Sequence, residues 1–150
     1  METNIQIREV QVTYQPLKGK LFQVRNSKDA FAYFSAAYND ATIGLCEEFM
    51  VLLLNRANRV LGCLKLSKGG ITGTVVDVRI LFATALKSMA CSVILAHNHP
   101  SGNLEPSEAD KELTTQITNA GRLLDIQVID HLILGIDDDY ASFADEGWLS

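Results

Sequence analysis

Two of the three histidines in this 150-residue chain lie in one tripeptide, His97-Asn98-His99, which follows the apolar run Ser92 to Ala96. Side chains two positions apart in an extended segment point to the same side, so both imidazoles can face one metal ion while Asn98 faces away. Asp110 follows at the expected start of a helix, where its carboxylate can fold back toward the histidines. Two neutral nitrogens and one carboxylate leave a fourth tetrahedral position open, as in a hydrolytic zinc site.

These residues also have an interpretation without a metal. Pro106, Ser107 and Asp110 are spaced as in a helix start whose N-cap serine is answered by an acidic residue three positions later. A histidine at a strand end is often only a half-buried polar residue bonded to the backbone. The occurrence of both patterns at a fixed distance favours the metal site.

The combined spacing also resembles a known motif. His97, His99, Ser107 and Asp110 match the pattern HxH, seven residues, Ser, two residues, Asp, which resembles the JAMM motif of JAB/MPN metallopeptidases. The letters HNHPSG followed by PSxxD narrow the resemblance to the bacterial RadC-like branch.

Two later segments extend this resemblance toward the C-terminus. Residues 130–135 resemble the branch's DHxIxG segment, and residues 142–149 resemble its C-terminal end. The resemblance begins near Glu47, and the first forty-odd residues carry no motif of the family. It implies an α/β fold with a single JAB/MPN-type domain at 43–150, a mixed sheet flanked by helices in a cytidine-deaminase-like layout. Residues 1–42 are expected to form a short strand-helix extension packed on that domain.

The resemblance implies a zinc-dependent metallopeptidase or isopeptidase with a peptide or protein substrate. One Zn²⁺ per chain is expected, held by His97, His99 and Asp110, where it would activate water and polarise the scissile carbonyl. Ser107 is expected to donate a hydrogen bond to the developing oxyanion if its hydroxyl turns toward the metal. The residues themselves indicate a hydrolytic metal site and leave the bond open.

A zinc hydrolase also needs a base, and this chain has no HExxH motif. Glu47 and Glu48 both precede the apolar run that opens at Phe49, but they point to opposite faces of a strand. In the RadC-like branch that the chain resembles, the catalytic glutamate stands two residues before the aromatic residue that opens the strand. This ExF pattern selects Glu47 as the catalytic base. The more distant eukaryotic JAMM pattern can be aligned to select Glu48, so both assignments stay open.

The third histidine, His131, lies in the DHxIxG-like segment. A fourth metal ligand would close the site to water, so we expect Asp130 or His131 to support a ligand or the sheet. His131 is therefore not among the predicted site residues.

Hydrophobic periodicity predicts the elements that must position this site. A hairpin turn is expected at Asn55 to Asn58, and Ser27 is expected to cap the first helix. The expected strands are 5–14, 49–54, 60–66, 74–76, 92–96, 126–134 and 140–143, and the expected helices are 27–38, 78–90 and 107–124.

Composition predicts one compact domain, since 47% of the residues are apolar and 21% are charged. No apolar run approaches the roughly 20 residues that span a bilayer, and the N-terminus lacks the pattern of a signal peptide, so a cytoplasmic location is expected. Cys46, Cys63 and Cys91 are widely spaced among apolar neighbours and are interpreted as core residues.

The net charge of −5 argues against a surface built to neutralise phosphates. A local exception is the stretch between 55 and 76, which is basic without an acidic residue and contains Arg56, Arg59, Lys65 and Lys68. It could form a basic strip beside the site, but an ordinary solvated hairpin is the favoured interpretation. The alternative function is a DNA-repair or mobile-element-associated protein that binds nucleic acid or protein partners without peptidase turnover.

Overall fold

A computed structural model describes residues 15, 18–69 and 75–149. The strand expected at 5–14 lies outside these residues. In chain order the elements are α1 (Ser27–Ala37), β1 (Glu48–Leu54), β2 (Val60–Lys68), α2 (Val78–Lys87), β3 (Ser92–Asn98), α3 (Glu108–Leu123), β4 (Gln127–Leu134) and β5 (Tyr140–Ser142).

The five strands form one mixed sheet in the order β2-β1-β3-β4-β5. β1 pairs antiparallel with β2 and β3, whereas β3 pairs parallel with β4, and β5 is antiparallel to β4. The register places Phe49 of β1 opposite His97, and His131 of β4 opposite Leu95. Side chains from both neighbours of β3 therefore lie beside the histidines at its end.

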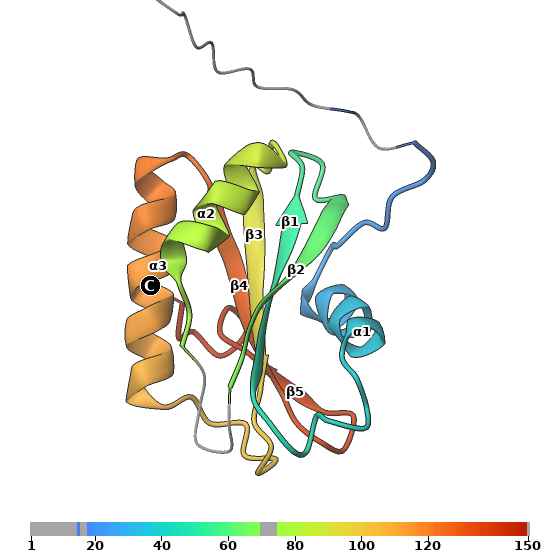
Figure 1. The fold of residues 1–150 in the computed structure, drawn as a ribbon, viewed down its shortest axis with the longest axis vertical. Coiled ribbons are helices and arrows are strands. Elements are labelled where there is room, and N and C mark those ends of the chain that lie inside the picture. The colour runs from blue at the N-terminus through green and yellow to red at the C-terminus, as the bar shows by residue number, and fades with distance from the viewer. Residues whose placement is uncertain (1–14, 16–17, 70–74, 150) are drawn as a thin grey trace, which may run out of the picture.

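Helices cover both faces of this sheet: α2 and α3 lie on one side and α1 on the other (Figure 1). All seven residues of β1 are buried, and so are all seven of β3, which explains why their sequences are continuous apolar runs. Alternate residues of β1 separate into two clusters: Phe49, Val51 and Leu53 pack with α2 and α3, and Met50, Leu52 and Leu54 pack with α1. The expected single α/β domain with a mixed sheet is confirmed.

Side-chain caps fix where the helices begin. The N-cap of α1 is Asn26, which accepts from the backbone N–H of Asp29, so the assignment of that cap to Ser27 was wrong by one residue. Asp77 caps α2 by accepting from the N–H of Arg79. In both cases a short polar side chain satisfies a donor that the helix leaves unpaired.

The strand expected at 74–76 is not found in its described part, because Val75 and Val76 belong to no strand. Val75 is 88% exposed, whereas Val76 packs against the cluster that contains Leu81. Val76 directly precedes the cap of α2, and an apolar residue there commonly packs against the first turns of the helix. Its β-branched side chain therefore anchors a helix start.

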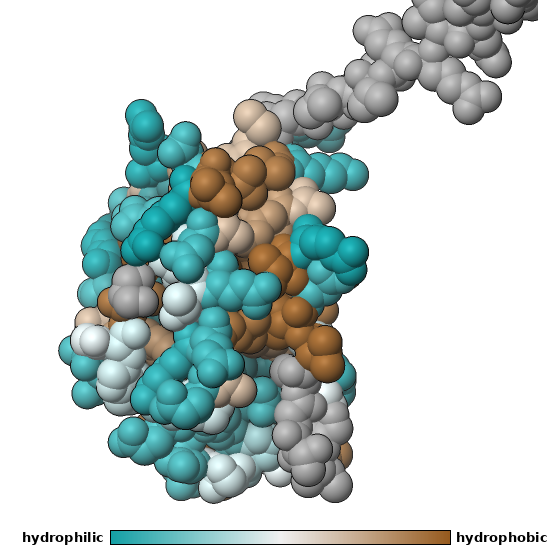
Figure 2. Space-filling model, turned by 90° about the vertical axis from the view of Figure 1, so that its left-hand side faces the viewer, coloured by the Kyte–Doolittle hydropathy of each residue, from teal (hydrophilic) through white to brown (hydrophobic). Residues whose placement is uncertain are grey.

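Large hydrophobic side chains are exposed where α2 and α3 end: Leu86, Met89, Leu123 and Leu124. Figure 2 shows hydrophobic surface toward this end of the molecule. The histidine strand β3 ends, and α3 begins, at the opposite end (Figure 1). Within the described ranges, no helix is long and apolar enough to cross a membrane.

The buried Asp130 joins β4 to the segment after β5. Its carboxylate accepts from the Ser142 hydroxyl at 2.6 Å, from the Ala144 N–H at 2.9 Å and from the His131 N–H at 2.7 Å. Burial raises the pKa of Asp130, although the Ser142 hydrogen bond opposes the rise. This carboxyl group is thus a structural support, as expected for one of the pair Asp130 and His131.

Asp130→Ala should lower the free energy of unfolding by about 2 to 4 kcal/mol, because it leaves buried donors without acceptors. Asp130→Asn keeps the oxygen that accepts from the His131 and Ala144 N–H groups, so it should cost about 1 kcal/mol or less. Urea unfolding of both variants measures the difference. Equal losses would contradict a role based on these hydrogen bonds.

Candidate metal centre

His97, His99 and Asp110 converge at the end of β3. Their ligand atoms all lie within 4.8 Å of one another. The two Nε2 atoms are 2.9 Å apart, and Asp110 places Oδ1 3.3 Å from His97 Nε2 and Oδ2 3.4 Å from His99 Nε2. The structure thus brings together the three predicted ligands, of which His97 is only 1% exposed.

The Asp110 carboxylate lies in the first turn of α3, which places it beside both histidines. Ser107 and Asp110 form a capping box, in which Ser107 Oγ accepts from the Asp110 N–H and Asp110 Oδ2 accepts from the Ser107 N–H. The interpretation as a helix cap is therefore correct. It does not exclude the metal site, because the same carboxylate also faces both histidines.

The hydroxyl of Ser107 keeps its proton free for a second role. A serine hydroxyl has one donor and two acceptor positions, and the capping bond uses one acceptor. Capping the helix and donating to a substrate oxygen are therefore compatible.

Protonation of the site follows from its hydrogen bonds. Burial opposes ionisation of Asp110, but hydrogen bonds from the His97 and His99 side chains outweigh it and hold the pKa of Asp110 well below its usual range. The hydrogen bond to Asp110 raises the pKa of His99, although burial opposes this. The site thus favours an anionic carboxylate facing positive charge, whether a proton or a cation supplies it.

The backbone fixes the orientation of His99. Its Nδ1 lies 2.5 Å from the Asn103 carbonyl, and a carbonyl only accepts, so Nδ1 carries the proton. In the neutral ring, Nε2 then presents a lone pair to His97 and Asp110. The contact is made by the backbone carbonyl of Asn103, so the residue type at this position gave no signal of it in the sequence.

Glu47 and Glu48 lie on opposite faces of the sheet. Phe49 is stacked on His97, with ring centroids 6.1 Å apart, and Glu47 is two residues before Phe49, so it shares the face of the candidate metal ligands. Glu47 is half-buried, and its charge contributes to the raised pKa of His99, after the larger effect of the Asp110 hydrogen bond.

Glu48 belongs to the face covered by α1. Its side chain pairs with Lys68 at 3.4 Å, it is 8% exposed, and its Oε2 has no hydrogen-bond partner. Burial, followed by the charge of Glu48, raises the pKa of Tyr38, whose hydroxyl donates to the Glu48 carbonyl. The parity argument that selects Glu47 is thus consistent with the geometry.

Asn98, between the two candidate ligand histidines, connects the loop before β1 to β3. Its Oδ1 accepts from the Glu48 N–H at 2.8 Å, and its Nδ2 donates to the carbonyls of Ile43 and Cys46 at 2.6 and 2.9 Å. These three bonds fix where β1 begins relative to the histidines.

His131 lies behind His97, fully buried between Phe49 and Phe143. Its Nε2 is 2.7 Å from His97 Nδ1, and its Nδ1 is 2.7 Å from the Thr114 hydroxyl. Burial holds the pKa of His131 well below its usual value, so the ring is neutral. Sequence patterns did not single out Thr114, although it follows Asp110 by one helical turn and so shares its face of α3.

Comparison with known proteins adds to this geometry. A family profile described as the RadC-like JAB domain matches residues 24–148. The chain belongs to this family. The matched region of the RadC-like JAB domain includes α1, and it confirms the resemblance and the fold class inferred from the sequence.

Curated relatives carry the name UPF0758 protein. One from Flavobacterium johnsoniae is 48% identical over 128 residues, which cover 85% of this chain and 54% of the relative. Another from Chlorobaculum parvum is 37% identical over 127 residues, covering 85% of this chain and 55% of the relative. The chain thus spans about half the length of these relatives.

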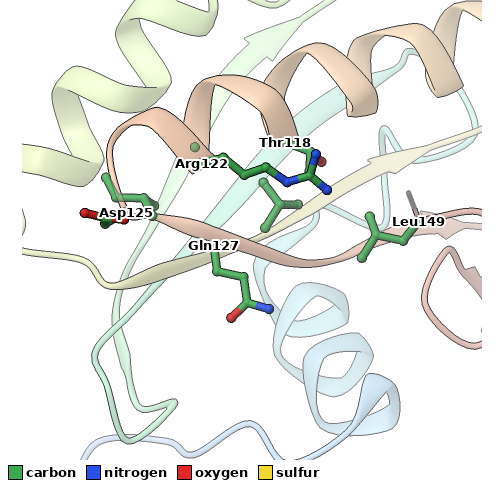
Figure 3. A pocket seen from close by; sticks show the side chains of 8 residues that line it. Thr118, Arg122, Asp125, Gln127 and Leu149 are labelled. Carbon is green, nitrogen blue, oxygen red and sulfur yellow. The ribbon is translucent and has the colours of Figure 1, made fainter.

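A separate cavity lies away from the candidate ligands of this RadC-like JAB domain. It has a volume of about 480 Å³ and lies between the last turns of α3 and the start of β4, with Arg122, Asp125, Gln127 and Leu149 at its border (Figure 3). Asp110 is at the other end of α3, so this cavity is not part of the histidine site.

Proposed function

We propose that this RadC-like JAB domain is a zinc-dependent hydrolase of the JAMM type, which cleaves a main-chain or isopeptide amide bond in a peptide or protein substrate. The observation that carries the proposal is the convergence of two imidazole nitrogens and the Asp110 carboxylate at the end of β3. Glu47 on the same face of the sheet adds a group that can move protons.

The chemistry of the three side chains fits zinc. Hydrolytic zinc sites use three nitrogen or carboxylate ligands and keep the fourth position for water or substrate, and His97, His99 and Asp110 provide such a set. The close approach of two Nε2 atoms and a carboxylate is also compatible with a cation between them. When bound, zinc would lower the pKa of a water molecule toward neutrality and polarise the scissile carbonyl.

The other steps belong to side chains of the domain. Glu47 accepts the proton of the attacking water and transfers it to the leaving amine, which requires a carboxylate near the site that is not itself a ligand. Ser107 donates its free hydroxyl proton to the substrate oxygen that gains negative charge. Because Ser107 is fixed by the capping box, this donor is oriented before the substrate arrives.

Metal analysis of the purified protein tests the binding step. After zinc loading and dialysis, we expect one zinc ion per chain, with His97 and His99 nitrogens about 2.0 to 2.1 Å from it by X-ray absorption spectroscopy. Incubation with a peptide library, followed by mass spectrometry, should reveal new termini that disappear with a chelator and return with zinc. A protein that retains no zinc would contradict the proposal, and so would a zinc-loaded protein that produces no new termini from main-chain and isopeptide-linked substrates.

A further inference from the structure

A chain of hydrogen bonds through Thr114 and His131 also connects Asp110 to His97. It reaches His97 at Nδ1, the ring nitrogen that does not face Asp110. The Thr114 hydroxyl lies 2.7 Å from the Asp110 carbonyl and 2.7 Å from His131 Nδ1, and His131 Nε2 lies 2.7 Å from His97 Nδ1. Thr114 and His131 are 3% and 0% exposed, so solvent does not compete for these bonds.

The direction of each bond follows from which atoms can donate. A carbonyl oxygen only accepts, so the Thr114 hydroxyl donates its single proton to Asp110. The Thr114 oxygen must then accept from His131 Nδ1, which places the ring proton there. A neutral imidazole carries one proton, so His131 Nε2 accepts from His97 Nδ1.

These bond directions fix the tautomer of His97, one of the proposed metal ligands. With its proton on Nδ1, neutral His97 presents an unprotonated Nε2 to His99 and Asp110. The opposite tautomer would place a proton where a metal ion must bind. Partners that fix the tautomer of a ligating histidine typically affect metal affinity by 10- to 100-fold.

We propose that Thr114 and His131 are positioning residues that hold His97 in the metal-binding tautomer through this hydrogen-bond relay. The inference rests on the proposed function in that it takes zinc to be the ion bound. Packing supports the relay, because Phe143 is stacked on His131 at 4.6 Å between ring centroids and Phe49 meets the ring edge-on at 5.5 Å. The His131 ring therefore cannot turn freely to change its partners.

The first test uses the metal-free native protein. Nitrogen-15 NMR distinguishes protonated from unprotonated ring nitrogens, and the chain has only three histidines to assign. The relay requires the proton on Nδ1 of both His97 and His131. A proton on Nε2 of either ring would overturn the proposal.

The second test compares zinc affinity among threonine variants by competition with a chromogenic chelator. Thr118 is the matched control: its hydroxyl donates to the Thr114 carbonyl at 2.8 Å, as Thr114 donates to Asp110, and it is similarly buried. Thr114→Val should weaken zinc binding at least about tenfold, whereas Thr118→Val should change it less than about twofold. Thr114→Ser, which keeps the hydroxyl, should bind zinc almost as the native protein does.

Equal affinities of Thr114→Val and Thr118→Val would overturn the relay, since a packing role alone predicts no difference between them. Neither test requires turnover, so the relay and the proposed function can fail separately. Zinc affinities and tautomers as expected, without any amide hydrolysis, would refute the hydrolase and leave the relay standing. If the native protein binds no zinc, the proposed function fails and the tautomers of His97 and His131 decide the relay.

Discussion

Glu47→Gln is expected to keep zinc bound and to lower amide hydrolysis by at least about 100-fold. Glutamine has nearly the shape of glutamate but cannot accept a proton at neutral pH, and residue 47 is not one of the three ligands. The loss should therefore fall on turnover, with metal content unchanged. Metal analysis and hydrolysis measured on the same preparation separate the two quantities.

Glu48→Gln is the matched control for this experiment, because it makes the same chemical change one residue away on the opposite face. Its side chain contacts Lys68 and not the histidines, so hydrolysis should remain within about twofold of the native rate. If Glu48→Gln is the inactive variant, Glu48 is the base and the parity assignment is wrong. If both variants hydrolyse normally, another group activates the water.

Asp110→Ala should abolish both zinc binding and hydrolysis. Two histidines remain, and a site with only two protein ligands lacks the set used by catalytic zinc. The variant should also lose about 1 kcal/mol from the start of α3, because Asp110 is one half of the capping box.

Ser107→Ala separates the cap from the ligand. It removes the other half of the capping box, with a similar loss of about 1 kcal/mol, but leaves all three ligands in place. It should therefore still bind one zinc ion per chain. Zinc retained by Asp110→Ala would refute the carboxylate as a ligand, and zinc lost by Ser107→Ala would indicate that the cap is needed to present it.

The sequence was sufficient for the parts of the site that lie on one element. The spacing of His97 and His99 predicts a shared face of a strand, and Ser107 with Asp110 predicts a helix start, because both patterns depend only on local geometry. The parity of Glu47 relative to Phe49 is local in the same sense. The expected helices over 78–90 and 107–124 were close to α2 and α3 because their apolar residues follow the helical period.

Contacts between elements could not be predicted in this way. The relay from Thr114 to His131 joins a helix to a strand, and it depends on the parallel register of β3 and β4. Val75 and Val76 have high strand propensity, yet Val76 packs against the core at the start of α2, since tertiary packing outweighs local preference.

The three bonds made by Asn98 give the HNH tripeptide a second meaning. Its outer members carry the nitrogens of the proposed metal site, while the middle one bonds the backbone just before and at the start of the neighbouring strand and so helps to hold Glu47 and Glu48 on their respective faces. The same three residues therefore carry two proposed ligands and the side chain that aligns the strand next to them. A designer who transplants His97, His99 and Asp110 without Asn98 would therefore transfer the proposed ligands without the bonds that hold the neighbouring strand in phase with them.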